Sequence, residues 1–127
     1  MLQGFSQETA PLSDVELLAM EFIIPTLKLA YGRKNAVFNQ QIADACPVEI
    51  RPGPARIRKI INHIRQNDLV PCLIATSKGY YVAESEDELK DYEDSLRGRA
   101  EAIMGVCESI ERQRKKRYCG PFQGRLF

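Results

Sequence analysis

The chain has 127 residues, of which 44% are hydrophobic and 28% charged, a composition typical of one folded globular domain. No stretch approaches the roughly 18–20 apolar residues of a membrane span, and no basic and apolar leader is visible, so we expect a soluble, cytoplasmic protein without a membrane partner. The net charge of +1 hides four blocks, which carry −3 over residues 1–31, +5 over 32–83, −7 over 84–111 and +6 over 112–127.

The residue patterns that carry most enzyme chemistry are missing from the sequence. Cys46, Cys72, Cys107 and Cys119 stand 26, 35 and 12 residues apart, and His63 is the only histidine, which is not the close pairing of a zinc site. We expect free thiols in a reducing compartment, with no metal and no cofactor. Since there is also no glycine-rich phosphate loop, we expect neither an enzyme nor a small-molecule substrate.

The first predicted helix covers residues 12–31 and follows an arm over 1–11 that shows no periodicity. Ser13 with Glu16 three residues later is typical of a capping box at a helix start. Pro25 removes a backbone donor, so the helix should stop or kink there. The apolar face of this helix is predicted to consist of Val15, Leu18 and Phe22, with Leu17 and Met20.

A helix-turn-helix is predicted over residues 38–67. Its short first helix should begin with Asn39 as the N-cap and end at Pro47. After a proline-rich connector, Pro54 suits the first turn of a further helix that should run to about Asn67. The spacing i, i+3, i+4, i+7 predicts that one face of this helix is buried, with the residues Ile57, Ile60, Ile61 and Ile64.

A hairpin and a long helix complete the predicted fold. Two short β-branched or aromatic runs predict a hairpin over residues 69–83, with Pro71 delaying its first strand. Ser85 and Glu88 form a second capping box that opens a helix over 85–117, and a flexible tail follows over 118–127. This order predicts a mainly α fold with a small β-hairpin, namely a winged helix-turn-helix plus a long C-terminal helix, over 12–117 as one domain.

The predicted helix from Pro54 to about Asn67 is the candidate surface for double-stranded DNA. No acid occurs between Arg51 and Asn67, whereas an ordinary solvated helix face, which is the alternative, usually mixes both signs. Amides suit base edges, and arginine or lysine suits guanine or phosphate. The predicted DNA-binding residues are Ala55, Lys59, Asn62 and Gln66 at the outermost positions and Arg56, Arg58 and His63 on the flanks. Arg51 is a candidate contact to the DNA backbone, and Lys78 is a candidate contact to a phosphate or the minor groove. For Lys78 the alternative is a turn that is merely polar.

Several segments resemble a winged-helix family that is common in bacteriophages and prophages. The resemblance rests on residues 60–65, a following Val-Pro-Cys segment, the Gly-Tyr-Tyr run within 78–83, and a helix with Glu88-Leu89 and Ser95-Leu96-Arg97. It covers roughly residues 38–110 and implies a DNA-binding winged helix, acting as a regulator or accessory DNA-processing factor. The chain departs from the family in its long proline-rich connector and in Asn67-Asp68, where a glycine is common.

The long C-terminal helix has two interpretations. A strict seven-residue spacing relates Leu89, Leu96, Ile103 and Ile110. This spacing favours a coiled-coil seam that joins two copies into a homodimer, although Arg99 and Gln113 fall at core positions of that register. The alternative is a stripe that also includes Ala100 and Cys107 and packs on the first helix of the same chain. The basic run over 112–117 fits DNA phosphates and a helix C-terminus equally well. The predicted dimer residues are Leu89, Tyr92, Leu96, Ile103 and Ile110.

A different function remains open beside DNA binding. The winged-helix fold does not by itself imply contact with DNA. The alternative is a protein–protein interaction module that works through the acidic C-terminal helix.

Overall fold

The computed structural model describes residues 10–118, and the chain forms two compact units, one ending at Leu89 and the other beginning at Lys90. The boundary between the two units lies inside the last helix, none of whose residues is buried. The predicted arm over 1–11 and tail over 118–127 lie outside the described residues, apart from residues 10, 11 and 118.

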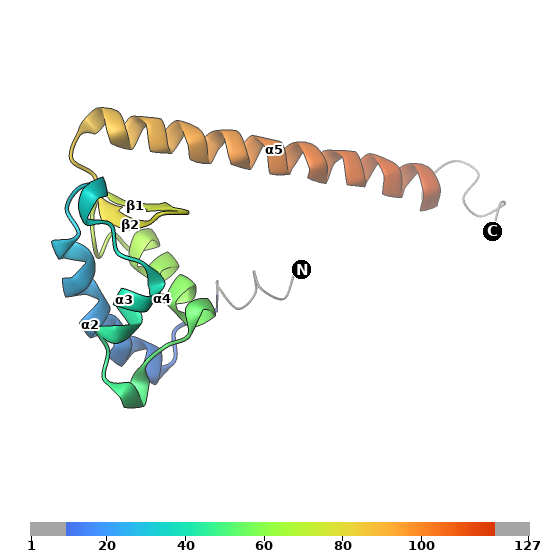
Figure 1. Ribbon diagram of the computed structural model, residues 1–127. Helices are drawn as coiled ribbons and strands as arrows, with labels where there is room; N and C mark the ends of the chain where they lie inside the picture. The colour runs from blue at the N-terminus through green and yellow to red at the C-terminus, as the bar shows by residue number, and fades with distance from the viewer. Residues whose placement is uncertain (1–9, 119–127) are drawn as a thin grey trace. The chain divides into compact units, whose positions relative to one another are not determined.

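Between residues 10 and 85, the first unit contains three α-helices and a β-hairpin (Figure 1). The helices are α2 (Asp14–Leu29), α3 (Asn39–Asp44) and α4 (Pro54–Gln66), with 3₁₀ turns at Arg33–Asn35 and Val48–Ile50. The helix α2 packs against both α3 and α4, and α3 packs against α4. The core between them contains Ala19, Ile23, Leu27, Ile42, Ala43, Cys46, Ile57, Ile60, Ile61, Ile64, Val70 and Leu73.

The buried face of α2 differs from the predicted one. Ala19, Ile23 and Leu27 are buried, whereas the predicted core residues Val15, Leu18 and Phe22 expose 39%, 50% and 41% of their surface. Because α2 carries apolar side chains on most sides, its periodicity does not single out one face. On the buried face, the Cys46 thiol donates to the Ala19 carbonyl at 3.7 Å.

The predicted signals at the helix ends have mixed outcomes. The capping box of α2 is confirmed, because the Glu16 N–H donates to Ser13 Oγ at 3.2 Å and the Ser13 N–H donates to Glu16 Oε1 at 2.8 Å. Pro25 lies inside α2 and does not end it. The prediction of Asn39 as an N-cap is wrong: Asn39 is the first helical residue, and the preceding Phe38 N–H is satisfied by the Gln41 side chain at 2.8 Å.

The hairpin consists of β1 (Leu73–Thr76) and β2 (Gly79–Val82), antiparallel with Leu73 opposite Val82. As predicted, the first strand begins only after Pro71. The other edge of β2 bonds to the segment between α2 and α3, since Val37 and Tyr80 exchange two N–H···O bonds of 2.9 Å. The strand β2 is therefore hydrogen-bonded on both edges.

The helix α5 (Glu86–Tyr118) ends the described part of the chain. Ser85 caps it as predicted, because the Glu88 N–H donates to Ser85 Oγ at 3.2 Å, while the Glu88 carboxylate accepts from the Glu84 N–H at 2.9 Å. Within residues 10–118 no helix combines the length and the apolar character needed to cross a membrane. The fold is thus mainly α, with one small hairpin, a long C-terminal helix and the element order of a winged helix-turn-helix.

Candidate nucleic-acid interface

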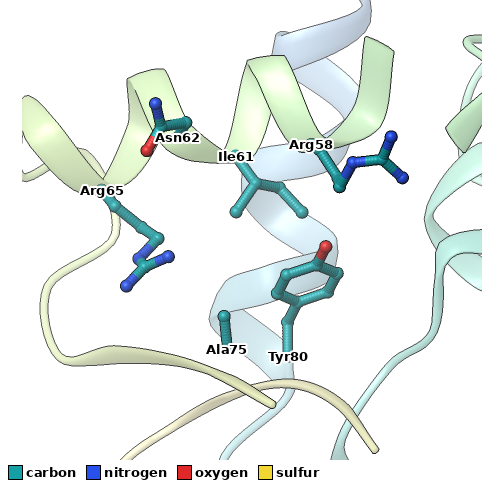
Figure 2. Close-up of a pocket in the computed structure, with 6 residues that line it drawn as sticks. All are labelled: Arg58, Ile61, Asn62, Arg65, Ala75 and Tyr80. Atoms are coloured by element: carbon teal, nitrogen blue, oxygen red, sulfur yellow. The ribbon is translucent and has the colours of Figure 1, made fainter. Parts of the chain in front are cut away.

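The helix α4 is covered on two sides, which decides which of its residues face solvent. Its four isoleucines are buried as predicted. One flank lies against α2, and the other lies beside the hairpin, where Ile61 points toward the strands and the Tyr80 hydroxyl points back toward α4 (Figure 2). The strip that stays at the surface follows the spacing i, i+3, i+7, i+11. It consists of Ala55, Arg58 and Gln66, which are exposed, and Asn62, which is partly exposed.

Lys59, which the sequence placed among the outermost residues of α4, lies on the flank that meets α2. Its side chain is only 16% exposed, and its ammonium donates to Glu16 Oε1 at 2.7 Å. Arg56 approaches the other carboxylate oxygen, with 3.6 Å between Nε and Oε2, and keeps 52% of its side chain exposed. The outermost placement of Lys59 is therefore wrong, because a buried acid from another helix draws the ammonium inward.

Glu16 joins the start of α2 to α4. Its side chain is 5% exposed, and Oε1 accepts from both Ser13 N–H and Lys59. Burial by itself would raise the pKa of Glu16, but the hydrogen bonds from Lys59 and Ser13 and the charge of Lys59 outweigh it and hold the pKa below the ordinary value. Glu16 is therefore ionised in the folded protein, and the two cations beside it are partly neutralised.

A shallow hollow of about 200 Å³ separates α4 from the hairpin. In Figure 2, Arg58 and Arg65 extend from α4 on either side of Ile61, while Ala75 and Tyr80 form the floor from the strands. Asn62 lies at the rim of the hollow, on the strip that faces solvent. Two cations and an amide within two helical turns are what a phosphate backbone and base edges require.

Arg65 and Tyr80 also belong to this surface, although neither is among the predicted DNA-binding residues. The periodicity of α4 places Arg65 close to the buried face, and only the position of the hairpin brings it to the rim of the hollow. Tyr80 and Tyr81 alternate along β2, so their side chains lie on opposite faces of the strand. Tyr81 is 2% exposed, and Tyr80 is the one that reaches the hollow.

The remaining predicted DNA-binding residues lie around this surface. Lys78 is exposed in the two-residue turn of the hairpin, which is closed by a 3.1 Å bond from the Lys78 N–H to Thr76 Oγ1. Arg51 instead donates to the Cys46 carbonyl at 3.1 Å and lies 3.9 Å from Asp44, so it closes the end of α3. His63 is partly exposed on the α2 flank, and its carbonyl accepts from the Asn67 side chain at 2.8 Å.

The predicted dimer residues all lie on α5 and none is buried. Leu89 and Tyr92 are half-buried, while Leu96, Ile103 and Ile110 expose 38%, 68% and 56% of their surface. The stripe predicted from the sequence thus exists as an apolar helix face that is open to solvent.

The described residues contain no group of three or more His, Cys, Asp or Glu side chains that could hold a metal ion. In residues 10–118 the thiols of Cys46, Cys72 and Cys107 are free, the first buried and the other two exposed. Comparison of the chain with family models, with curated proteins and with solved structures found no match.

Proposed function

We propose that this chain binds duplex DNA, with α4 in the major groove and the hairpin beside it, as a regulator or accessory DNA-processing factor of the bacteriophage or prophage type in a bacterial cytoplasm. The observation that carries the proposal is the solvent-facing strip of α4. The strip contains Arg58, Asn62 and Gln66 and has no acidic residue of its own, and Arg65 and Lys78 flank it. A helix in the major groove reads base edges with such amides and holds phosphates with such cations.

The salt dependence of binding tests this proposal directly. About four phosphate contacts per winged helix, from Arg56, Arg58, Arg65 and Lys78, should give a slope of log K against log[salt] near −3 to −4, at roughly −0.9 per phosphate. Fluorescence anisotropy of a labelled random-sequence duplex, titrated at several salt concentrations, measures the slope. Absence of binding to any duplex at ~50 mM salt would contradict the proposal and favour the protein-interaction module instead.

Substitutions at Asn62 and Lys78 should have different effects on binding. Because Asn62 lies on the central strip, Asn62→Ala should change which duplexes are selected from a random pool and cost about 1–3 kcal/mol on the preferred sequence. Lys78→Ala should weaken all sequences alike and reduce the magnitude of the salt slope by about one.

Lys28→Ala is the matched control for these variants, because Lys28 is an exposed cation on α2. It should leave both selection and slope unchanged. Equal effects of Lys28→Ala and Lys78→Ala would mean that the binding is not confined to α4 and the hairpin. Unchanged selection by Asn62→Ala would mean that this strip does not read bases.

A further inference from the structure

The part of α5 that belongs to the second unit exposes large apolar side chains between residues 96 and 110. Beside Leu96, Ile103 and Ile110, the side chains of Met104 and Val106 expose 56% and 64% of their surface. Gly98 and Gly105 each weaken the helix by about 1 kcal/mol relative to alanine. Since most helices in proteins gain their stability from packing an apolar face, a helix of this composition requires a partner surface.

The exposed face has the geometry of a coiled-coil seam. Leu89, Leu96, Ile103 and Ile110 recur every seven residues, and Ala100 and Cys107 follow four residues after Leu96 and Ile103. When the second core position of the heptad is taken four residues after the first, rather than three, Ala100 and Cys107 enter the seam in place of Arg99 and Gln113. Glu93 and Arg114 follow Leu89 and Ile110 by the same four residues, so they also lie in the seam. Around Ile103 and Cys107 the surface is hollowed and is also lined by Ala102 and Val106.

The charges of α5 discriminate between the two ways in which a second copy can lie on this seam. Residues 86–96 carry six acids and one base, whereas residues 108–118 carry five bases and two acids. A parallel pair would put acid against acid at one end and base against base at the other, with Glu93 facing Glu93 and Arg114 facing Arg114. An antiparallel pair puts the acidic end of each helix against the basic end of the other.

We propose that α5 pairs with α5 of a second copy of this chain in an antiparallel orientation. The register that brings Ile103 beside Cys107 of the second copy also aligns Ala100 with Ile110, Leu96 with Arg114 and Glu93 with Arg117. The aliphatic stem of Arg114 covers Leu96 of the second copy. This inference concerns α5 alone and does not depend on DNA binding by α4.

Disulfide trapping tests the orientation in the full-length chain. The background carries Cys72→Ser, Cys107→Ala and Cys119→Ser, and the buried Cys46 is kept. Leu96→Cys together with Arg114→Cys should give covalent dimers on mild oxidation, because the two positions face each other in the antiparallel register. Within one helix these positions are about 27 Å apart, so a disulfide inside one chain is impossible.

The two single variants are the matched controls. Leu96→Cys alone and Arg114→Cys alone should remain uncrosslinked, because each lies about 27 Å along the axis from its own copy. Efficient crosslinking of either single variant would overturn the antiparallel orientation in favour of the parallel one. Failure of the double variant to crosslink would also overturn it.

Sedimentation equilibrium tests the pairing independently of any cysteine. The wild type should be dimeric at ~100 μM, and Ile103→Asp should weaken the dimer about 100-fold or more while leaving the circular dichroism of the first unit unchanged. Raising the salt concentration should weaken an antiparallel dimer, whereas it would strengthen a parallel one by screening its repulsion. A wild type that remains monomeric at ~100 μM would overturn the proposal, and the apolar face of α5 would then require a different occupant.

Discussion

Replacement of Glu16 by glutamine should lower the free energy of unfolding of the first unit by about 3 kcal/mol. The substitution removes the charge that compensates the mostly buried ammonium of Lys59, and breaking one partner of a buried ion pair typically costs about 3–5 kcal/mol. The lower end applies here, since the amide oxygen of glutamine can still accept from the Ser13 N–H. Urea denaturation followed by near-ultraviolet circular dichroism of the tyrosines measures the change.

A double-mutant cycle separates the ion pair from other effects of the substitution. Lys59→Met removes the ammonium and keeps an apolar stem, so in that background Glu16→Gln should cost much less than in the wild type. Glu21→Gln, at an exposed position of the same helix, should change the stability by less than about 0.5 kcal/mol. Equal costs of Glu16→Gln with and without Lys59 would show that the pair is not coupled.

The stability should also depend on pH through Glu16. Because the pKa of Glu16 is lower in the folded than in the unfolded state, where it is close to 4.5, its contribution is fully present above pH 4.5. It is lost as the pH falls below 4.5 through the folded-state pKa. Glu16→Gln should remove this component, so the difference in stability between the wild type and the variant should shrink as the pH falls below 4.5.

Replacement of Gly79 by alanine should destabilise the hairpin by about 3 kcal/mol. Gly79 has φ +111°, a conformation that residues with a side chain rarely adopt, and a Cβ there would lie 2.7 Å from the Val37 carbonyl oxygen. The backbone strain costs about 1–3 kcal/mol, and the contact with a rigid carbonyl adds to it. The change is measured by urea denaturation, as for Glu16.

Gly98→Ala is the matched control for this glycine. Gly98 lies in α5 with open space around the position of a Cβ, so alanine there should stabilise the helix rather than weaken it. A loss of less than about 1 kcal/mol for Gly79→Ala would mean that the segment containing Val37 moves away at little cost.

The sequence predicted those parts of the fold that depend on neighbours along the chain. Pro54 and the isoleucine spacing located α4 to within a residue, and Ser13 with Glu16 located the start of α2. These signals are local, because a cap or a first-turn proline acts within one helical turn.

Contacts between segments that lie far apart along the chain could not be predicted from the sequence. Glu16 has a second role, holding Lys59 from 43 residues away, which no pattern along α2 or α4 indicates. For the candidate DNA surface, periodicity located the helix and its buried side, but the rotation of its exposed strip depends on where α2 and the hairpin lie. That is why Lys59 was placed outside and Arg65 was missed.

The hydrogen bonding of β2 on both edges has a consequence for how this protein opens. Along β2 the Tyr80 N–H donates to the Val37 carbonyl at 2.9 Å and the Val82 N–H donates to the Ala30 carbonyl at 2.7 Å. Both amides are therefore held by the segment that follows α2 and not by β1. A brief separation of β1 from β2 leaves these two amides covered. In hydrogen–deuterium exchange they should be among the slowest amides and exchange together with those of the core helices, whereas the amides of β1 should exchange through a smaller, local opening. We therefore expect β2 to open only together with the helices, whereas β1 can open without them.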